Sequence, residues 1–350
     1  MDFELSEKHQ MLQRATREFA ENVVAPRVPE MEETHELPRD LVAEMAGMGL
    51  MGILTPAEYG GTDMGFLARV VAVEQISRVS AAAGMFIQTH HTGMAAILDF
   101  GTPEQKRKYL PSLSSGATVA ALAITEPSGG SDVMGMQAAA RRDGDGYVLN
   151  GRKCFISNSH QAGTIVVVAR TGEGPKGLSA FIVESGAPGF RPGRKEQKCG
   201  LLGVTTGELI MQECRVPREN LIGEEGAGMR VALKAISETG RLGMAATALG
   251  IIGACLEKSV HYARSRKLYG RYLLGPRGGA SPHLPRRVVE GQRQTQRRGG
   301  HAGKSLCLRG GRPGRAQRHH HPRRIRRHER VRCPALSAGR AGLCSRGRHH

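Results

Sequence analysis

The residues with the clearest chemical character lie in the stretch 120–139, AALAITEPSGGSDVMGMQAA. A short apolar run ends at Thr125, and a loop of glycine, serine and aspartate follows it. Glycine allows a tight turn in which backbone N–H groups can approach an anionic ligand. The stretch predicts a strand that ends in a ligand-facing turn, with Thr125 and Ser131 as hydroxyl donors. An ordinary surface loop has the same composition, so the loop alone leaves both interpretations open.

The residues before this stretch have helical spacing. Met11, Ala15, Phe19 and Val23 recur at every fourth position, which is typical of one face of an amphipathic helix. We expect Pro26 to end this helix, and helical patterns return several times up to about residue 114. Residues 1–116 are therefore predicted to form an N-terminal all-α domain.

The residues after the stretch follow a strand pattern. Short β-branched or apolar runs occupy 165–169, 178–183 and 208–216. Asn150-Gly151 is a strong signal for a tight turn and predicts a hairpin that joins 147–149 to 153–157. Residues 117–225 are expected to form a middle β-domain, either a small sheet pair or a barrel.

From Gly226 the helical spacing returns and continues to Arg266, and we expect one long helix whose apolar face includes Met229, Leu233 and Ile236. Residues 226–274 are interpreted as part of a C-terminal helical domain. The glycines inside this helix each cost about 1 kcal/mol relative to alanine. Their expected use is the close approach of another helix or a ligand.

Charge and cysteine content narrow the function classes. The chain has 350 residues and a net charge of +18, and all of this excess lies in residues 275–350, so the rest is neutral. The seven cysteines include no CxxC pair, which favours isolated thiols in a reducing compartment over disulfides or a metal site. The N-terminus lacks the apolar segment of a signal peptide, and no uninterrupted apolar run reaches about 18 residues. We therefore expect a cytoplasmic protein without membrane contact.

Residues 275–350 contain 19 Arg, one Lys and no aromatic residue, and they show no helical or strand period. Such a composition predicts disorder, because it cannot bury enough apolar surface to offset the ordering entropy. One hypothesis is a nucleic-acid-binding arm. The favoured hypothesis is a change of reading frame near Leu273 in a GC-rich gene, which would produce Arg, Gly, Pro, Ala and His.

Five motifs in order give residues 1–272 a resemblance to the acyl-CoA dehydrogenases. They are AITEPSGGSD at 123–132, NGRKCFISN at 150–158, KGLSAF at 176–181, VPRENLIG at 216–223 and RSRKLYG at 264–270. The resemblance implies a flavoprotein that desaturates acyl-CoA thioesters between Cα and Cβ. The implied fold class is α+β multidomain: an N-terminal helical domain, a middle β-barrel or sheet domain, and a C-terminal helical bundle that is incomplete in this chain.

The same resemblance implies FAD as cofactor. Phe155 resembles the residue beside the isoalloxazine ring, and Ser157 resembles the hydroxyl that hydrogen-bonds flavin N5. Arg266 resembles an arginine that reaches the FAD of a neighbouring subunit. Core packing, a turn hydroxyl and a solvated charge are the respective structural alternatives. The complete implied FAD set is Leu122, Ile124, Thr125, Gly130, Ser131, Phe155, Ile156, Ser157 and Arg266.

The resemblance further implies that acyl-CoA contacts Ser131 and the segment Glu238, Thr239, Gly240 and Arg241. Dehydrogenation needs a glutamate in a dry pocket to take the α-proton. In most relatives it lies beyond the point where this chain diverges, and in a minority it stands directly before the arginine, where this chain has Gly240. Glu238 is a poor candidate, because it points about 200° away from that site on a helix. The family also implies an electron-transfer flavoprotein as electron acceptor and a homotetramer. We expect weak turnover, with a non-catalytic flavin or acyl-CoA binder as the alternative.

Overall fold

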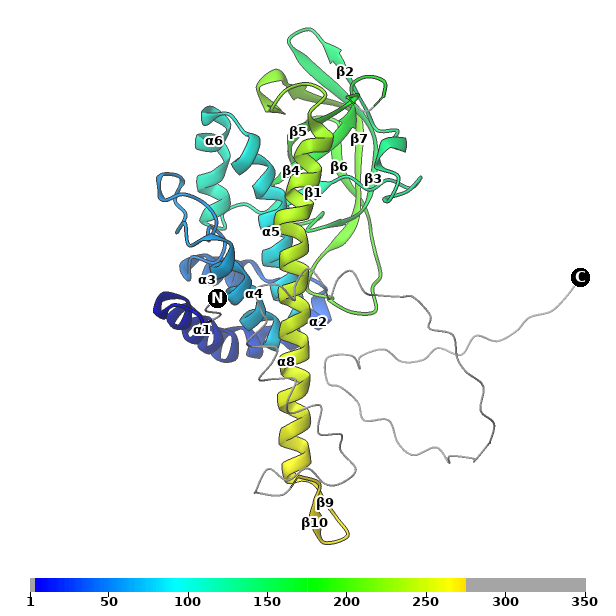
Figure 1. Cartoon of the computed structure of the whole chain (residues 1–350). Coiled ribbons are helices and arrows are strands. Elements are labelled where there is room, and N and C mark those ends of the chain that lie inside the picture. Colours follow the sequence, from blue (N-terminus) through cyan, green and yellow to red (C-terminus); the bar gives the residue numbers. More distant parts are fainter. Residues whose placement is uncertain (1–3, 175, 275–350) are drawn as a thin grey trace, which may run out of the picture.

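The computed structural model describes residues 4–174 and 176–274. Helices form one part of the molecule and a β-sheet forms another, while one long helix, α8 (Arg241–Ser265), runs alongside the helical part to a small hairpin at its far end (Figure 1). This arrangement confirms the α+β fold class. The predicted tail 275–350 lies outside the described residues, and the exact domain boundaries stay predictions.

The N-terminal part is helical, as predicted. Its elements are α1 (Glu7–Phe19), η1 (Ala20–Val24), α2 (Ala25–Thr34), α3 (Arg39–Gly47), η2 (Ala57–Tyr59), α4 (Gly65–Val79), α5 (Ala81–Phe100) and α6 (Pro103–Ser114). The expected helix end at Pro26 is wrong. The π-helical turn η1 joins α1 directly to α2, and Pro26 lies in the first turn of α2, where a missing N–H costs little.

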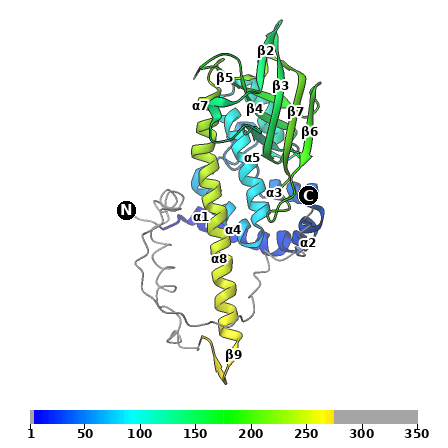
Figure 2. The ribbon, with the colours of Figure 1, turned by 90° about the vertical axis from the view of Figure 1, so that its right-hand side faces the viewer.

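The middle part is one eight-stranded sheet rather than two sheets. Its strands are β1 (Ala120–Ala123), β2 (Ala139–Asp143), β3 (Gly146–Ser157), β4 (Thr164–Arg170), β5 (Leu178–Glu184), β6 (Phe190–Lys195), β7 (Thr206–Pro217) and β8 (Leu221–Ile222), with η3 (Val133–Gly135) and η4 (Arg218–Asn220) between them. The order is β6-β7-β3-β2-β4-β5-β8, and β1 pairs in parallel with β4. Helix α5 contacts both β1 and α8, so it lies between the sheet and the long helix (Figure 2).

The hairpin predicted at Asn150-Gly151 is wrong, because β3 continues through both residues. The turn lies earlier, between β2 and β3, where Gly144 has a φ of +61°. Asn150 instead binds Glu213 of β7, donating to its carboxylate at 2.7 Å and accepting from its N–H at 2.8 Å. Gly151 has a φ of +147°, and a Cβ there would lie 2.5 Å from the Cβ of Ala138. The Asn-Gly pair therefore marks an irregularity within a strand.

The C-terminal part is nearly continuous helix, from α7 (Gly228–Lys234) through the π-helical turn η5 (Ala235–Gly240) into α8, followed by β9 (Lys267–Leu268) and β10 (Arg271–Tyr272). The predicted apolar face needs correction. Leu233 is exposed, and the buried residues of α8 are the small Gly243, Ala246, Thr247 and Gly250. These small residues face α4 and α5, and their size lets α8 pack closely on both helices.

By length and composition alone, the helical run Gly228–Ser265 could cross a membrane, contrary to the sequence expectation. The expectation required an uninterrupted apolar run, whereas this helix is long and apolar on average. Core helices of globular proteins meet the same criterion, so the observation is weak evidence for a membrane span.

Candidate functional site

The end of β1 meets the middle of β3 at a β-bulge. The Cys154 N–H donates to the Thr125 carbonyl at 2.9 Å, and the pairing of β3 with β7 shifts register between Lys153 and Ile156. Phe155 lies in this bulge with a φ of +56°, a conformation that costs a non-glycine residue free energy and is enriched at functional sites. The residue is 62% exposed. The bulge thus turns a large aromatic ring outward beside the strand end.

The loop after Thr125 is a compact turn. Glu126 and Gly129 exchange backbone hydrogen bonds of 3.2 and 3.0 Å. Gly130 lies so close to Thr125 that a Cβ at Gly130 would be 3.1 Å from the Thr125 Cγ2. Gly130 and Ser131 are exposed. The turn therefore presents the Gly130–Ser131 backbone on the surface, as its composition predicts.

The other sequence-predicted FAD residues divide by burial. The predicted FAD residues from β1, from the segment just after β1 and from β3 lie in one region. Ile124 and Ile156 are buried, and Leu122, Thr125 and Ser157 are partly buried. Arg266 is exposed and lies between α8 and β9, at the end of the long helix away from β1 and β3 (Figure 1). Within one chain, the structure brings together all of the predicted FAD residues except Arg266.

Sequence reasoning missed a buried ion pair beneath the loop. Lys153 is fully buried, and its ammonium lies 2.7 Å from the Glu126 carboxylate. Burial lowers the pKa of Lys153, and the Glu126 carboxylate opposes that shift. Burial also opposes ionisation of Glu126, yet Lys153 and two backbone N–H donors hold the pKa of this carboxyl below its usual range. Both residues belong to the quoted motifs, but only the fold shows that they meet.

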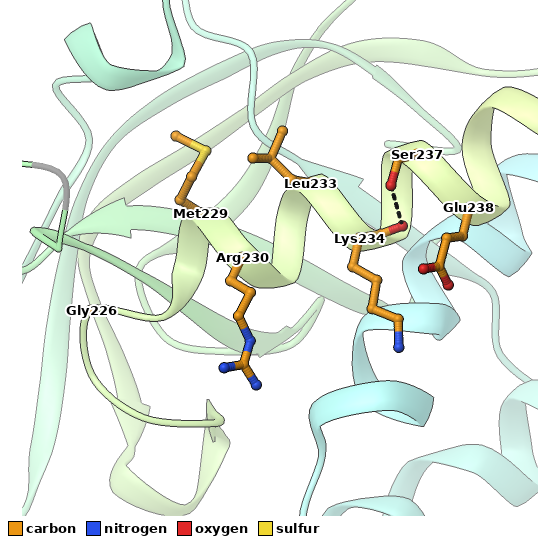
Figure 3. Close-up of a pocket in the computed structure, with 7 residues that line it drawn as sticks. All are labelled: Gly226, Met229, Arg230, Leu233, Lys234, Ser237 and Glu238. Carbon is orange, nitrogen blue, oxygen red and sulfur yellow. Dashed lines mark hydrogen bonds between the residues drawn. The ribbon is translucent and has the colours of Figure 1, made fainter.

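An open groove of about 520 Å³ follows α7 and η5. Figure 3 shows Met229 and Leu233 on one side of the helix and the charged Arg230, Lys234 and Glu238 on the other. Its lining residues are Gly226, Met229, Arg230, Leu233, Lys234, Ser237 and Glu238. The groove therefore offers an apolar side and a charged side to a ligand.

The cations of the groove are fixed by the C-terminal end of α5. Arg230 and Lys234 stack over the Phe100 ring at 5.1 and 5.6 Å from its centroid. Lys234 also lies 3.5 Å from Asp99. Burial raises the pKa of Asp99, an effect that Lys234 opposes. Asp99 is a partly buried carboxylate that the sequence pattern did not indicate.

The segment Glu238–Arg241 spans the join between η5 and α8. Glu238 and Arg241 are exposed and Thr239 is buried. At Gly240 a Cβ would find only ordinary contacts, the Ala235 carbonyl and Thr92 both at 3.7 Å. Gly240 thus faces α5 while Glu238 lies in the groove, so the two positions point to different surroundings, as expected.

A second polar cluster lies between α4 and α5. The Arg69 Nε donates to His91 Nδ1 at 3.1 Å, and His91 Nε2 lies 2.9 Å from the Leu50 carbonyl. Burial lowers the pKa of Arg69 to about 10 and holds that of His91 well below its ordinary value. Arg69 also lies against Gly243 of α8, where a Cβ would be 2.5 Å from its Nη2. The cluster supports the junction of three helices. Across residues 4–174 and 176–274, the His, Cys, Asp and Glu side chains form no group of three suited to a metal ion.

A helical domain, a β-domain with a bulged strand and a long helix define a three-part α+β fold. Family models match each part: the acyl-CoA dehydrogenase N-terminal domain at residues 6–117, the middle domain at 121–214 and the C-terminal domain at 226–278. The chain belongs to the acyl-CoA dehydrogenase family, and by family it is an oxidoreductase acting on CH–CH bonds.

Individual relatives agree with the family assignment. An acyl-CoA dehydrogenase of Bacillus subtilis is 42% identical over 277 residues, which cover 78% of this chain and 73% of the relative. A chain in a structure of the electron transferring flavoprotein of Acidaminococcus fermentans is 38% identical, with a TM-score of 0.77 and coverage of 88% and 78%. An acyl-CoA dehydrogenase complexed with FAD from Bacillus anthracis is 34% identical, with a TM-score of 0.73 and coverage of 77% and 47%.

Proposed function

We propose that this chain binds FAD and an acyl-CoA thioester where β1, β3 and the α7–η5 segment meet, and that it turns over weakly or not at all. The observation that carries the FAD part is Phe155, an exposed aromatic ring held by strained backbone beside the Gly-rich loop. An exposed ring on a rigid strand gives a flat cofactor a packing surface. The FAD complex of the Bacillus anthracis relative supports the same cofactor.

The residues present fit FAD. When bound, FAD supplies the hydride acceptor for the dehydrogenation. Phe155 would pack against the flavin, and the hydroxyls of Thr125 and Ser157 would donate hydrogen bonds to it. The backbone of Gly130 and Ser131 would bind phosphate oxygens.

The groove on α7 and η5 suits the acyl-CoA. Its Arg230 and Lys234 side chains would bind the CoA phosphates, since guanidinium and ammonium groups pair well with phosphate. Met229 and Ile236 pack partly buried against the same apolar cluster as Leu122 and Val133. This common apolar surface would take the pantetheine and acyl parts between the long helix and β1.

We infer that the residues which the structure describes do not supply the catalytic base. The α-proton of a thioester is weakly acidic, so its removal needs a carboxylate in a dry pocket close to the acyl group. Glu238 is exposed in the groove, and Asp99 is paired with Lys234. Neither stands at Gly240, which has no side chain and where a Cβ would meet the Ala235 carbonyl and Thr92 at ordinary contact distance. We therefore infer impaired turnover, while a non-catalytic flavin or acyl-CoA binder is the alternative.

Partners follow from the family. Electrons would pass to an electron-transfer flavoprotein, and the similarity to a chain in the Acidaminococcus fermentans structure supports that pairing. A homotetramer, a cytoplasmic location and FAD contact by Arg266 of a neighbouring subunit stay predictions. Nucleic-acid binding by residues 275–350 is a less favoured prediction; such binding would be sensitive to salt and lost when these residues are deleted.

The decisive experiment measures flavin absorbance of the purified chain and its loss on addition of acyl-CoA. We expect bound flavin with slow or absent bleaching. Gly240→Glu should accelerate bleaching at least tenfold, because it restores a carboxylate before Arg241, whereas Gly240→Ala should leave the rate unchanged. Rapid bleaching by the unmodified chain would refute the missing base, and a chain that binds no flavin would refute the cofactor assignment.

A further inference from the structure

The pair Lys153–Glu126 lies at the base of the Gly-rich loop and joins both of its ends. The Lys153 ammonium donates to the Glu126 carboxylate at 2.7 Å and to the Ile124 carbonyl at 3.0 Å. The same carboxylate accepts the N–H of Gln137 at 2.6 Å and that of Ala138 at 3.0 Å. One carboxylate thus connects the chain entering the loop to the chain leaving it.

This network also determines which groups the loop can offer to a ligand. Lys153 satisfies the carbonyl of Ile124, and the N–H of Cys154 satisfies that of Thr125 at 2.9 Å. The acceptors at the strand end are therefore used inside the domain. Among the exposed residues 127–132, Ser128, Gly130 and Ser131 carry the hydroxyl and N–H donors that can bind phosphate oxygens, whereas the Gly129 N–H is already bonded to the Glu126 carbonyl.

We propose that the Lys153–Glu126 pair is a positioning device that holds the Gly-rich loop in its FAD-binding conformation before the cofactor arrives. The inference rests on the proposed function. Ordering a mobile loop upon binding costs free energy, and a loop that is already ordered avoids that cost. Loss of the pair should therefore weaken FAD binding even where the domain stays folded.

A simple deletion of one partner is a poor test, because it leaves an uncompensated buried charge that is itself strongly destabilising. The informative variant is the double substitution Lys153→Met/Glu126→Met, since replacing a buried pair by apolar residues of similar size is often neutral for stability. Lys195→Met is the matched control. Lys195 ends β6 of the same sheet and pairs with Glu36 of the helical part, where the two side chains are 35% and 48% exposed.

Two measurements apply to each protein: the FAD dissociation constant by flavin fluorescence, and amide hydrogen exchange of the apoprotein. For the double variant we expect a dissociation constant at least tenfold higher and faster exchange at Gln137 and Ala138, with protection of the β3–β7 ladder unchanged. Lys195→Met should match the unmodified chain in both measurements.

Unchanged FAD affinity in the double variant would overturn the proposal. Failure of the double variant to fold would overturn it as well, because the pair would then be part of the domain core rather than a positioning device. If the unmodified chain binds no FAD, the proposed function fails, and exchange at Gln137 and Ala138 still decides whether the pair orders the loop.

Discussion

The packing of α8 on α4 can be tested with two glycines of the same helical run. A Cβ at Gly250 would lie 2.5 Å from the Glu74 carbonyl oxygen and 2.6 Å from the Ser77 Cβ. The carbonyl oxygen belongs to the α4 backbone, which cannot rotate away as a side-chain tip can. A Cβ at Gly240 would instead have its nearest neighbours at 3.7 Å. Gly250→Ala should therefore push α8 away from α4, while Gly240→Ala should fit.

The magnitude follows from two opposing effects. Alanine is better than glycine inside a helix by about 1 kcal/mol, and this gain is common to both variants. Overpacking of a well-packed contact costs about 1–3 kcal/mol and applies only at Gly250. The difference between the two variants should therefore be about 1–3 kcal/mol in favour of Gly240→Ala.

Thermal unfolding monitored by circular dichroism measures this difference. Since the entropy of unfolding is about 2.1 cal/mol/K per residue, about 1–3 kcal/mol corresponds in a chain of 350 residues to a gap of roughly 1–5 °C between the melting temperatures. The unmodified chain should lie between the two variants or close to Gly250→Ala. A Gly250→Ala protein that melts at or above the temperature of Gly240→Ala would refute the close contact of α8 with α4.

Two further predictions concern buried polar groups. Burial lowers the pKa of His90 to about 4, so below the ordinary value of 6.5 the unfolded chain binds more protons than the folded chain. The free energy of unfolding should therefore fall as the pH drops from 6.5 towards 4, by about 2 kcal/mol at pH 5. Urea unfolding at pH 7 and pH 5 should show this loss, and His90→Gln should reduce it. The buried Tyr109 hydroxyl lies 2.8 Å from the Glu184 carboxylate and 3.0 Å from the Asn220 side-chain oxygen. Tyr109→Phe should therefore lower the free energy of unfolding in urea by about 1–2 kcal/mol. An unchanged free energy would show that these contacts contribute nothing to stability.

The helical part and most strands could be predicted because they depend on local periodicity. The same local reasoning failed at Pro26, which lies in the tolerated first turn of α2, and at Asn150-Gly151, where a distant residue decides the outcome. A π-helical turn connects the helices around Pro26, and Asn150 binds Glu213, which is far away in sequence. Turn signals therefore indicate where a backbone departs from regularity, but they do not show whether the chain reverses there.

The candidate site was predictable in a similar, uneven way. Phe155, Thr125 and Gly130 could be named from motifs, yet the strained backbone of Phe155 is visible only in the fold. A strained residue costs about 1–3 kcal/mol and persists only where its surroundings over-determine it. Here the two residues before it, Lys153 and Cys154, both bind carbonyls just after β1 and so fix the bulge from one side. The proposed cofactor contact Phe155 and the supporting residue Lys153 therefore lie in the same short stretch of sequence. A motif can indicate the exposed aromatic ring, but the role of the buried lysine depends on a partner that only the fold reveals.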